Sequence, residues 1–339
     1  MERLNLGASK QLAKSALLAT GALRWAGEVA GQGIVILLYH SVFEGPDSDQ
    51  NTLDMGHSVD IFERQIEIIA RTYDVVTMDE IPMFLSGEKR MPRRPVAVTF
   101  DDGYANNFEV ATPILNRYGV PATFYVTTDC IDRNQLPWIA RIRRAFRTTR
   151  RESWQAPDGR ELPLANHVER ETARVVACEY CAQLAGNRQE RVIETIESAL
   201  DLGPPAPATC RMLNWDELRR MVGEGHTVGS HTVSHPNLAH VVEDELKTEL
   251  VESKRRLEQE LGVPVPHFAY PNPILTPHWT TRTVAAIRRA DYRTAVIATP
   301  GIVRREDDPL CLHRVACSRK LDAFRWNLEC VFLGRRAMS

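Results

Sequence analysis

Short apolar runs separated by helical patterns give the chain its first structural signal. Residues 34–38, 96–100 and 122–126 have the length of buried strands, and each run ends at polar or turn residues. Between the first two, residues 61–70 repeat apolar side chains at the spacing of one helix face. The pattern continues in the apolar runs at residues 227–229, 267–270 and 294–297. Strands that alternate with helices predict a parallel sheet covered by helices.

Reactive residue types follow these strands. His40 comes after the first run, Asp101 and Asp102 after the second, and His231 and His235 after the run at 227–229. In parallel α/β barrels, active sites assemble at the C-terminal ends of the strands. We therefore expect the functional site at that end of the sheet.

Residues 131–210 interrupt the alternation with many charges, few strand signals and helical stretches at 167–185 and 189–200. We interpret this segment as a helical insertion in a barrel that spans residues 33–330, rather than as an independent domain. Its beginning is rich in arginine, with Arg133, Arg141, Arg143, Arg144, Arg147, Arg150 and Arg151. These residues form either a solvated helix face or a patch for an anionic polymer or a phosphate-bearing carrier.

The first 32 residues form a separate segment, which we expect to be helical. Three basic residues precede the apolar stretch at 16–23, as in a signal peptide, but that stretch is short. Arg24 and Glu28 follow it without a clean cleavage site. An amphipathic helix is the favoured interpretation, and such a helix can also contact a membrane surface.

Composition narrows the class of protein. The net charge of −2 gives no overall attraction to nucleic acid, and no apolar run approaches the roughly 20 residues of a membrane span. Seven cysteines lie scattered without a disulfide framework, which favours a reducing compartment. The pair Cys178 and Cys181 has C-x-x-C spacing but lies in a helical segment without a second pair. We expect a soluble, cytoplasmic protein, with export as the alternative.

Asp101 and Asp102 are the first candidates for chemistry. Side chains alternate along an extended strand, so two adjacent carboxylates point in different directions. One can bind a metal while the other acts on the substrate as a base, and Gly103 lets the backbone turn tightly. The alternative is that the carboxylates cap a helix over residues 104–118.

His231 and His235 form the second candidate group. At a spacing of four residues they would share one face of a helical turn, where both imidazoles can reach one ion. Together with an aspartate they make a set of ligands that leaves positions open for water and substrate. Zinc is the natural metal for hydrolytic work with such ligands.

Three segments in this order resemble the motifs of the polysaccharide deacetylases, carbohydrate esterase family 4, which carry a NodB homology domain. They are residues 99–103 (Thr-Phe-Asp-Asp-Gly), 230–235 (Ser-His-Thr-Val-Ser-His) and 268–271 (Phe-Ala-Tyr-Pro). The resemblance covers residues 34–316, apart from the insertion. It implies an incomplete or deformed (β/α)7 barrel.

The resemblance also implies a role for each matching residue. Asp102, His231 and His235 would bind the metal, and Asp101 would be the general base. The backbone N–H of Tyr270 would stabilise the oxyanion that forms as water attacks the acetamide carbonyl.

The resemblance also bears on four further residues. Thr232 would brace the histidine loop, and His40 either approaches the site or is structural. Pro273 replaces a glycine common in relatives, which stiffens that loop and removes an N–H donor. His313 is the candidate general acid, although the segment Leu312-His313-Arg314 aligns better with the Leu-Pro-Arg of other relatives.

We therefore expect a metal-dependent hydrolase that releases acetate from an N-acetylated glycan or lipid-linked saccharide in cell-surface polysaccharide biosynthesis. Two alternatives remain open. The same site could hydrolyse a non-sugar amide or a cyclic ureide or imide, or the chain could be an inactive glycan-binding homologue.

Overall fold

The computed structural model describes residues 20, 33–44, 56–201, 211–271 and 276–335. Its centre is a parallel sheet in the order β12-β11-β10-β9-β6-β5-β1-β13, and β4 (Asp74–Val75) pairs with the start of β5. The strands are β1 (Val35–Tyr39), β5 (Pro95–Phe100), β6 (Ala122–Val126), β9 (Thr227–Ser230), β10 (His267–Ala269), β11 (Thr294–Ile297), β12 (Leu312–His313) and β13 (Val315–Ala316). The six predicted strands are therefore confirmed, with small shifts at their ends.

Two very short strands bring the ends of the sheet together. β12 pairs with β11, β13 pairs with β1, and only Arg314 separates them in the chain. Counted as one interrupted strand, they complete a ring of seven parallel strands. The predicted (β/α)7 barrel, deformed at its closure, is confirmed.

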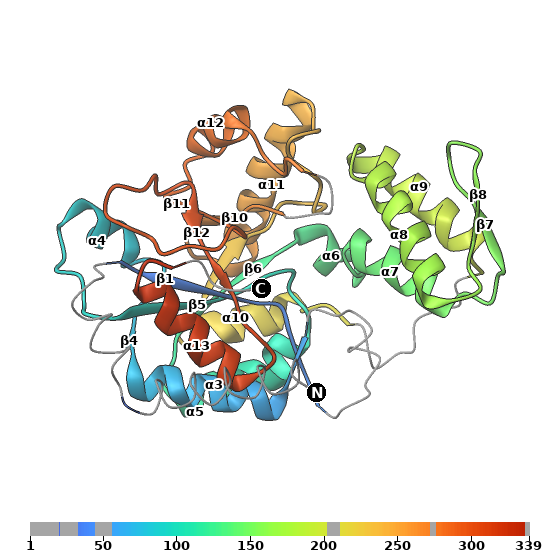
Figure 1. Ribbon diagram of the computed structural model, residues 1–339. Helices are drawn as coiled ribbons and strands as arrows, with labels where there is room; N and C mark the ends of the chain where they lie inside the picture. The colour runs from blue at the N-terminus through green and yellow to red at the C-terminus, as the bar shows by residue number, and fades with distance from the viewer. Residues whose placement is uncertain (1–19, 21–32, 45–55, 202–210, 272–275, 336–339) are drawn as a thin grey trace, which may run out of the picture.

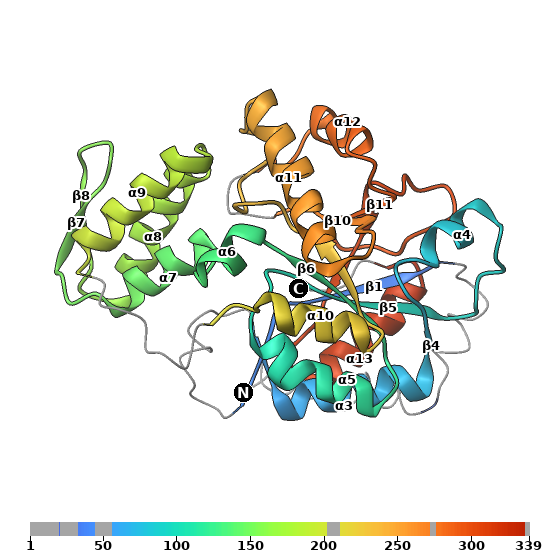
Figure 2. The same ribbon diagram turned by 180° about the vertical axis from the view of Figure 1, so that it is seen from behind.

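Helices cover the outside of the barrel. In Figures 1 and 2, α3 (Val59–Thr72), α5 (Thr112–Arg117) and α13 (Leu321–Phe332) lie together on one side. α11 (Glu243–Leu261) and α12 (Thr281–Arg289) lie on the opposite side. The remaining elements around the barrel are β2 (Ser41–Phe43), β3 (Gly56–Ser58), α4 (Ile81–Ser86), the π-helix η2 (Asn107–Ala111) and α10 (Trp215–Gly223).

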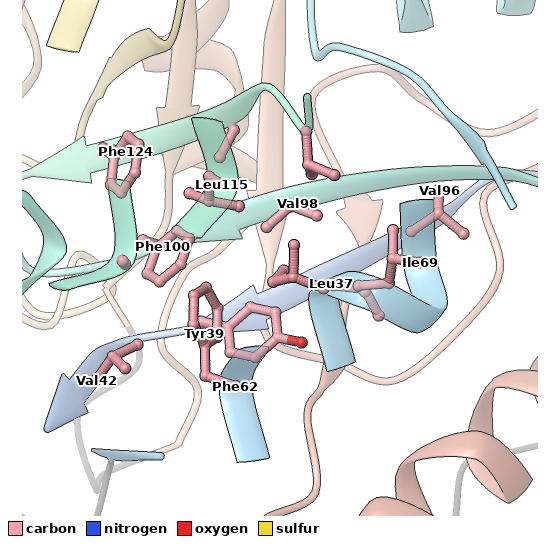
Figure 3. Packing of buried hydrophobic residues seen from close by; sticks show 14 of the residues in the cluster. Leu37, Tyr39, Val42, Phe62, Ile69, Val96, Val98, Phe100, Leu115 and Phe124 are labelled. Carbon is pink, nitrogen blue, oxygen red and sulfur yellow. The ribbon is translucent and has the colours of Figure 1, made fainter. Parts of the chain in front are cut away.

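The core between α3 and the strands explains why the helix forms where the sequence predicts it. Phe62, Ile66 and Ile69 are buried along one face of α3 at spacings of four and three residues. Figure 3 shows Phe62 against the aromatic rings of Tyr39 and Phe100 from β1 and β5. Each such fully buried side chain contributes about 1.5–3 kcal/mol to the stability of the fold.

The insertion projects beside the barrel, as Figure 1 shows at the right. It contains α6 (Thr128–Arg133), α7 (Trp138–Thr148), the antiparallel hairpin β7 (Ser153–Gln155) and β8 (Glu161–Pro163), α8 (His167–Cys181) and α9 (Gly186–Ala199). The hairpin was not predicted, because three-residue strands are too short to show an alternating pattern. The insertion also has a hydrophobic core of its own, built around Ile142, Phe146 and Trp154.

The structure shows the surroundings of two features predicted in the insertion, the pair of Cys178 and Cys181 and the residue Arg141. Cys178 and Cys181 are free thiols in the insertion core, and burial raises the pKa of Cys178 to about 11, so the pair packs as apolar side chains. Arg141 is buried, not solvated, and its guanidinium pairs with Glu190 at 2.7 Å and Glu197 at 2.6 Å.

The predicted N-terminal helix over residues 1–32 lies outside the described residues, except for Thr20. Within the described part of the chain, every helix is too short or too polar to span a bilayer.

Candidate metal centre

Three side chains from two strand ends meet at the C-terminal end of the barrel. Asp102 follows β5, and His231 and His235 lie in the loop after β9. One ligand atom from each lies within 4.8 Å of the others, and all three residues are buried. Asp102 Oδ1 is 3.6 Å from His231 Nε2 and 3.4 Å from His235 Nε2. The sequence prediction that these three residues converge is confirmed.

The convergence depends on unusual backbone conformations. Asp102, Thr232 and His235 have φ values of 74°, 71° and 60°. Such left-handed conformations cost non-glycine residues about 1–3 kcal/mol each and persist only where the surroundings hold them. Residues 231–235 form a loop, so the expectation that the histidines share a helical turn is wrong.

Asp102 can take this conformation because the chain turns at Gly103. The N–H of Gly103 donates to the carbonyl of Asp101 at 3.0 Å, and Gly103 has φ 85°. A Cβ at this position would lie 3.1 Å from the Val126 side chain. The backbone angle therefore favours glycine, as the sequence suggested, and a Cβ would make a tight contact with Val126.

The histidine loop is fixed from the α11 side. Thr232 Oγ1 accepts the N–H of His235 at 2.9 Å, which confirms the bracing role expected of Thr232. The Glu249 carboxylate accepts the N–H groups of Val233 and Ser234 at 2.8 and 2.9 Å, and the Ser234 hydroxyl at 2.6 Å. A buried carboxylate with three donors holds the loop between the two histidines.

The insertion fixes the same loop from the other side. The indole N–H of Trp138, at the start of α7, donates to the carbonyl of His235 at 2.8 Å. Backbone N–H groups of Thr128 and Asp129 in α6 donate to the carbonyls of Thr232 and Val233. The insertion is therefore part of the frame that positions His235.

Asp101 binds Arg314. Both oxygens of Asp101 accept hydrogen bonds from the guanidinium at 2.6 Å, and Arg314 is fully buried between β12 and β13. Burial alone would raise the pKa of Asp101, but the charge of Arg314 outweighs it and lowers the pKa to about 2. Asp101 is therefore ionised at neutral pH.

The two histidines are suited to bind a cation. Burial lowers the pKa of His231 and of His235 to about 4, so both imidazoles are neutral at pH 7. His231 Nδ1 shares a hydrogen bond with the carbonyl of Ala269 at 2.8 Å, so this nitrogen carries the proton and Nε2 is free to ligate. Asp102 then faces neutral rings, and a divalent cation would balance its buried charge. The donor set fits a metal of the zinc type.

The structure corrects two predicted roles. The backbone N–H of Tyr270 donates to the carbonyl of Val296 at 3.0 Å within the sheet, so it is not available to an oxyanion. The next N–H along the chain belongs to Asn272, because Pro271 has none, and Asn272 lies outside the described residues.

His313 does not reach the centre. Neighbouring side chains on a strand point to opposite faces, and Arg314 takes the inward position. His313 instead lies 3.2 Å from the carbonyl of Thr299, against Gly301. His40 is closer to the site, since it is among the groups that influence the pKa of Asp101 and of His235.

Three residues of the site were missed in the sequence. Arg314 had a signal, since alternation allows only one of His313 and Arg314 to face the barrel interior. Trp138 and Glu249 contact the loop across 97 and 15 residues of chain, and no local pattern marks them. The alternative that Asp101 and Asp102 cap a helix is wrong, because η2 begins at Asn107 and its N-cap residue is Asn106.

Comparison with known proteins places this site in context. A family model described as polysaccharide deacetylase matches residues 88–295. YxkH of Bacillus subtilis, which carries the name polysaccharide deacetylase, is 20% identical over 284 residues, which are 84% of this chain and 71% of that protein. A peptidoglycan-N-acetylglucosamine deacetylase of Bacillus cereus is 41% identical, but only over 54 residues, 16% of this chain and 19% of that protein.

Solved structures show the same fold. The deacetylase PplD of Streptococcus pyogenes aligns with a TM-score of 0.59 and 20% identity, covering 89% of this chain and 99% of PplD. IcaB of Ammonifex degensii aligns with a TM-score of 0.56 and 19% identity, covering 90% of this chain and 98% of IcaB. The family model spans more than half of the chain and includes the Asp101–Asp102 and histidine motifs, so the chain belongs to the polysaccharide deacetylase family, a family of hydrolases.

Proposed function

We propose that this enzyme hydrolyses the N-acetyl group of an N-acetylhexosamine in a glycan or lipid-linked saccharide, with a divalent cation, zinc, held by Asp102, His231 and His235. The observation that carries the proposal is the buried convergence of these three ligands beside an ionised second carboxylate. In the bound state the cation would polarise the acetamide carbonyl and acidify a water molecule.

Asp101 performs the proton transfers in this proposal. Its Oδ2 lies 4.0 Å from His231 Nε2, so it borders the site that the ligands enclose. It takes a proton from the water whose oxygen bonds to the carbonyl carbon. The C–N bond then breaks, and Asp101 returns the proton to the departing amine, which leaves acetate and a free amino sugar.

Arg314 sets how strong a base Asp101 is. A carboxylate with a pKa of about 2 is a weak base, so it removes a proton only from water that is already acidified. Asp101 and the cation are therefore expected to act only together. His313 is not needed for proton return in this scheme.

The substrate class rests on the family and on one relative. The Bacillus cereus protein named above is a peptidoglycan-N-acetylglucosamine deacetylase. Its similarity to this chain supports an N-acetylglucosamine unit of a cell-surface polysaccharide as the substrate.

The test is acetate release from N-acetylglucosamine oligomers and peptidoglycan fragments by the zinc-loaded protein. We expect release by the wild type and none by Asp102→Ala. A hydantoin serves as the competing substrate of the cyclic ureide class. Hydrolysis of the hydantoin, without acetate from any N-acetylated sugar, would overturn the proposal.

A further inference from the structure

A concave site lies at the opposite end of the barrel from the metal centre. A groove of about 610 Å³ is formed by two loops, residues 87–93 and 304–306, together with Phe84 of α4. The first loop leads from α4 into β5, and the second follows Val303, which pairs with Ile34 just before β1. Both loops thus lie at the N-terminal end of the barrel, opposite Asp102 and the histidines, and Figure 1 shows α4 beside the start of β1.

Positive charge dominates the lining of this groove. Five cationic side chains face one carboxylate, that of Glu306; the cations are Lys89, Arg90, Arg93, Arg304 and Arg305. The chain as a whole has a net charge of −2, so this concentration is not a property of its composition. The apolar part of the lining comes from Phe84, Met91 and Pro92.

Three of the five cations have no carboxylate partner among the residues that the structure describes: Arg90, Arg93 and Arg304. Exposed arginines elsewhere on the barrel are commonly paired, as Arg219 is with Asp216 and Glu260. Unpaired guanidiniums that share one hollow raise the local potential and favour an anionic ligand.

The other two cations are held in place by the fold. Lys89 forms an ion pair with Glu80 and lies over the Phe84 ring at 5.5 Å. The guanidinium of Arg305 donates to the carbonyl of Ser86 at 3.3 Å and lies directly on Gly87, where a Cβ would collide with it. Gly87 has φ 78° as the C-cap of α4, so this residue both ends the helix and admits Arg305.

We propose that this groove binds a phosphate group. Guanidinium groups match phosphate oxygens in a bidentate geometry, and a groove of this volume accommodates a ligand of headgroup or nucleotide size. The phosphate belongs either to a soluble phosphorylated compound or to a phospholipid headgroup.

The test compares two double variants of the full-length protein. Arg93→Gln with Arg304→Gln removes two exposed groove cations without a partner. The matched control, Arg191→Gln with Arg325→Gln, removes the same charge from exposed positions elsewhere. Binding is measured by calorimetry with pyrophosphate, and by co-sedimentation with phosphatidylcholine vesicles that contain or lack phosphatidylglycerol, at one fixed ionic strength. Acetate release by each variant verifies that the barrel is intact.

We expect the wild type to bind at least one probe, and the groove variant to bind it at least about tenfold more weakly, while the control binds as the wild type does. Pyrophosphate binding with this pattern identifies a soluble phosphate as the ligand, and binding restricted to phosphatidylglycerol vesicles identifies a lipid headgroup. Absence of binding to both probes, or an equal loss in the groove and control variants, would overturn the proposal.

Discussion

At the residue scale, short sequence motifs predicted some residues of the site, whereas others could be assigned only from the structure. Asp101, Asp102, His231 and His235 were predictable, because each follows a strand and all lie in short motifs. Tyr270 was assigned wrongly, because only the sheet shows that its N–H is bonded to Val296. The partner of Asp101 lies 213 residues away in the chain. Strand alternation could show that only one of His313 and Arg314 faces inward, but not that Arg314 meets Asp101 there.

The pair of Asp101 and Arg314 gives the first prediction. Arg314→Met leaves a buried carboxylate without its cation, which should destabilise the protein by about 3–5 kcal/mol and abolish acetate release. Urea denaturation measures the first effect. The double variant Asp101→Asn with Arg314→Met removes both charges, and it should recover most of the stability but no activity. An Arg314→Met protein that unfolds and turns over like the wild type would show that the pair has no such role.

At the scale of elements, the loop of residues 231–235 is shaped by its neighbours. α11 supplies Glu249, and the insertion supplies Trp138 and the start of α6. The sequence predicted both the loop's chemistry and the insertion, but it did not connect them. Trp138 and Glu249 make that connection by hydrogen bonds to backbone carbonyl and N–H groups of the loop. Every residue type has such backbone groups, so the sequence does not show which of them form these bonds.

Trp138→Phe tests the brace from the insertion. The variant loses the indole donor and leaves the carbonyl of His235 without it, which should weaken zinc binding by about 1–2 kcal/mol, or roughly five- to thirtyfold. Competition with a chromophoric chelator measures this affinity. Trp154→Phe is the control: it removes the same side-chain volume from the core of the insertion, away from the loop. This variant should bind zinc normally. Equal affinity in the two variants would exclude Trp138 as a positioning residue.

Glu249 provides a graded test of the brace from α11. Glu249→Ala removes the acceptor for three donors, so zinc affinity should fall by tenfold or more. Glu249→Gln retains an acceptor oxygen, so its zinc affinity should fall by less. Glu252→Ala, one turn away and exposed, is the control. If the three variants bind zinc alike, the loop holds its shape without Glu249.

At the scale of the whole molecule, alternating strands and helices predicted the barrel but not how it closes. β12 and β13 have two residues each, which is below the length at which a strand pattern can be read. The hairpin of the insertion escaped prediction for the same reason. Closure nevertheless matters for function, because it places Arg314 inside the barrel, against Asp101.

The stability of the whole molecule should depend on pH through a buried histidine outside the metal centre. Burial lowers the pKa of His57 to about 4, while its unfolded value is near 6.5. Between these values the unfolded chain binds the extra proton, so stability falls as pH drops from about 6.5 to 4. His57→Gln should remove about 3 kcal/mol of this loss, measured by urea denaturation of the metal-free protein at several pH values. An unchanged pH dependence in the variant would show that His57 does not contribute.

The central claim is that one cation, held by Asp102, His231 and His235, works with Asp101. The most direct measurement is zinc titration of chelator-treated protein, with bound metal and acetate release followed in the same samples. We predict that activity rises until one zinc ion per chain is bound, that Asp102→Ala neither binds zinc nor regains activity, and that Asp101→Asn binds the ion without turnover. Full acetate release by the metal-free protein, or by Asp101→Asn, would contradict the account.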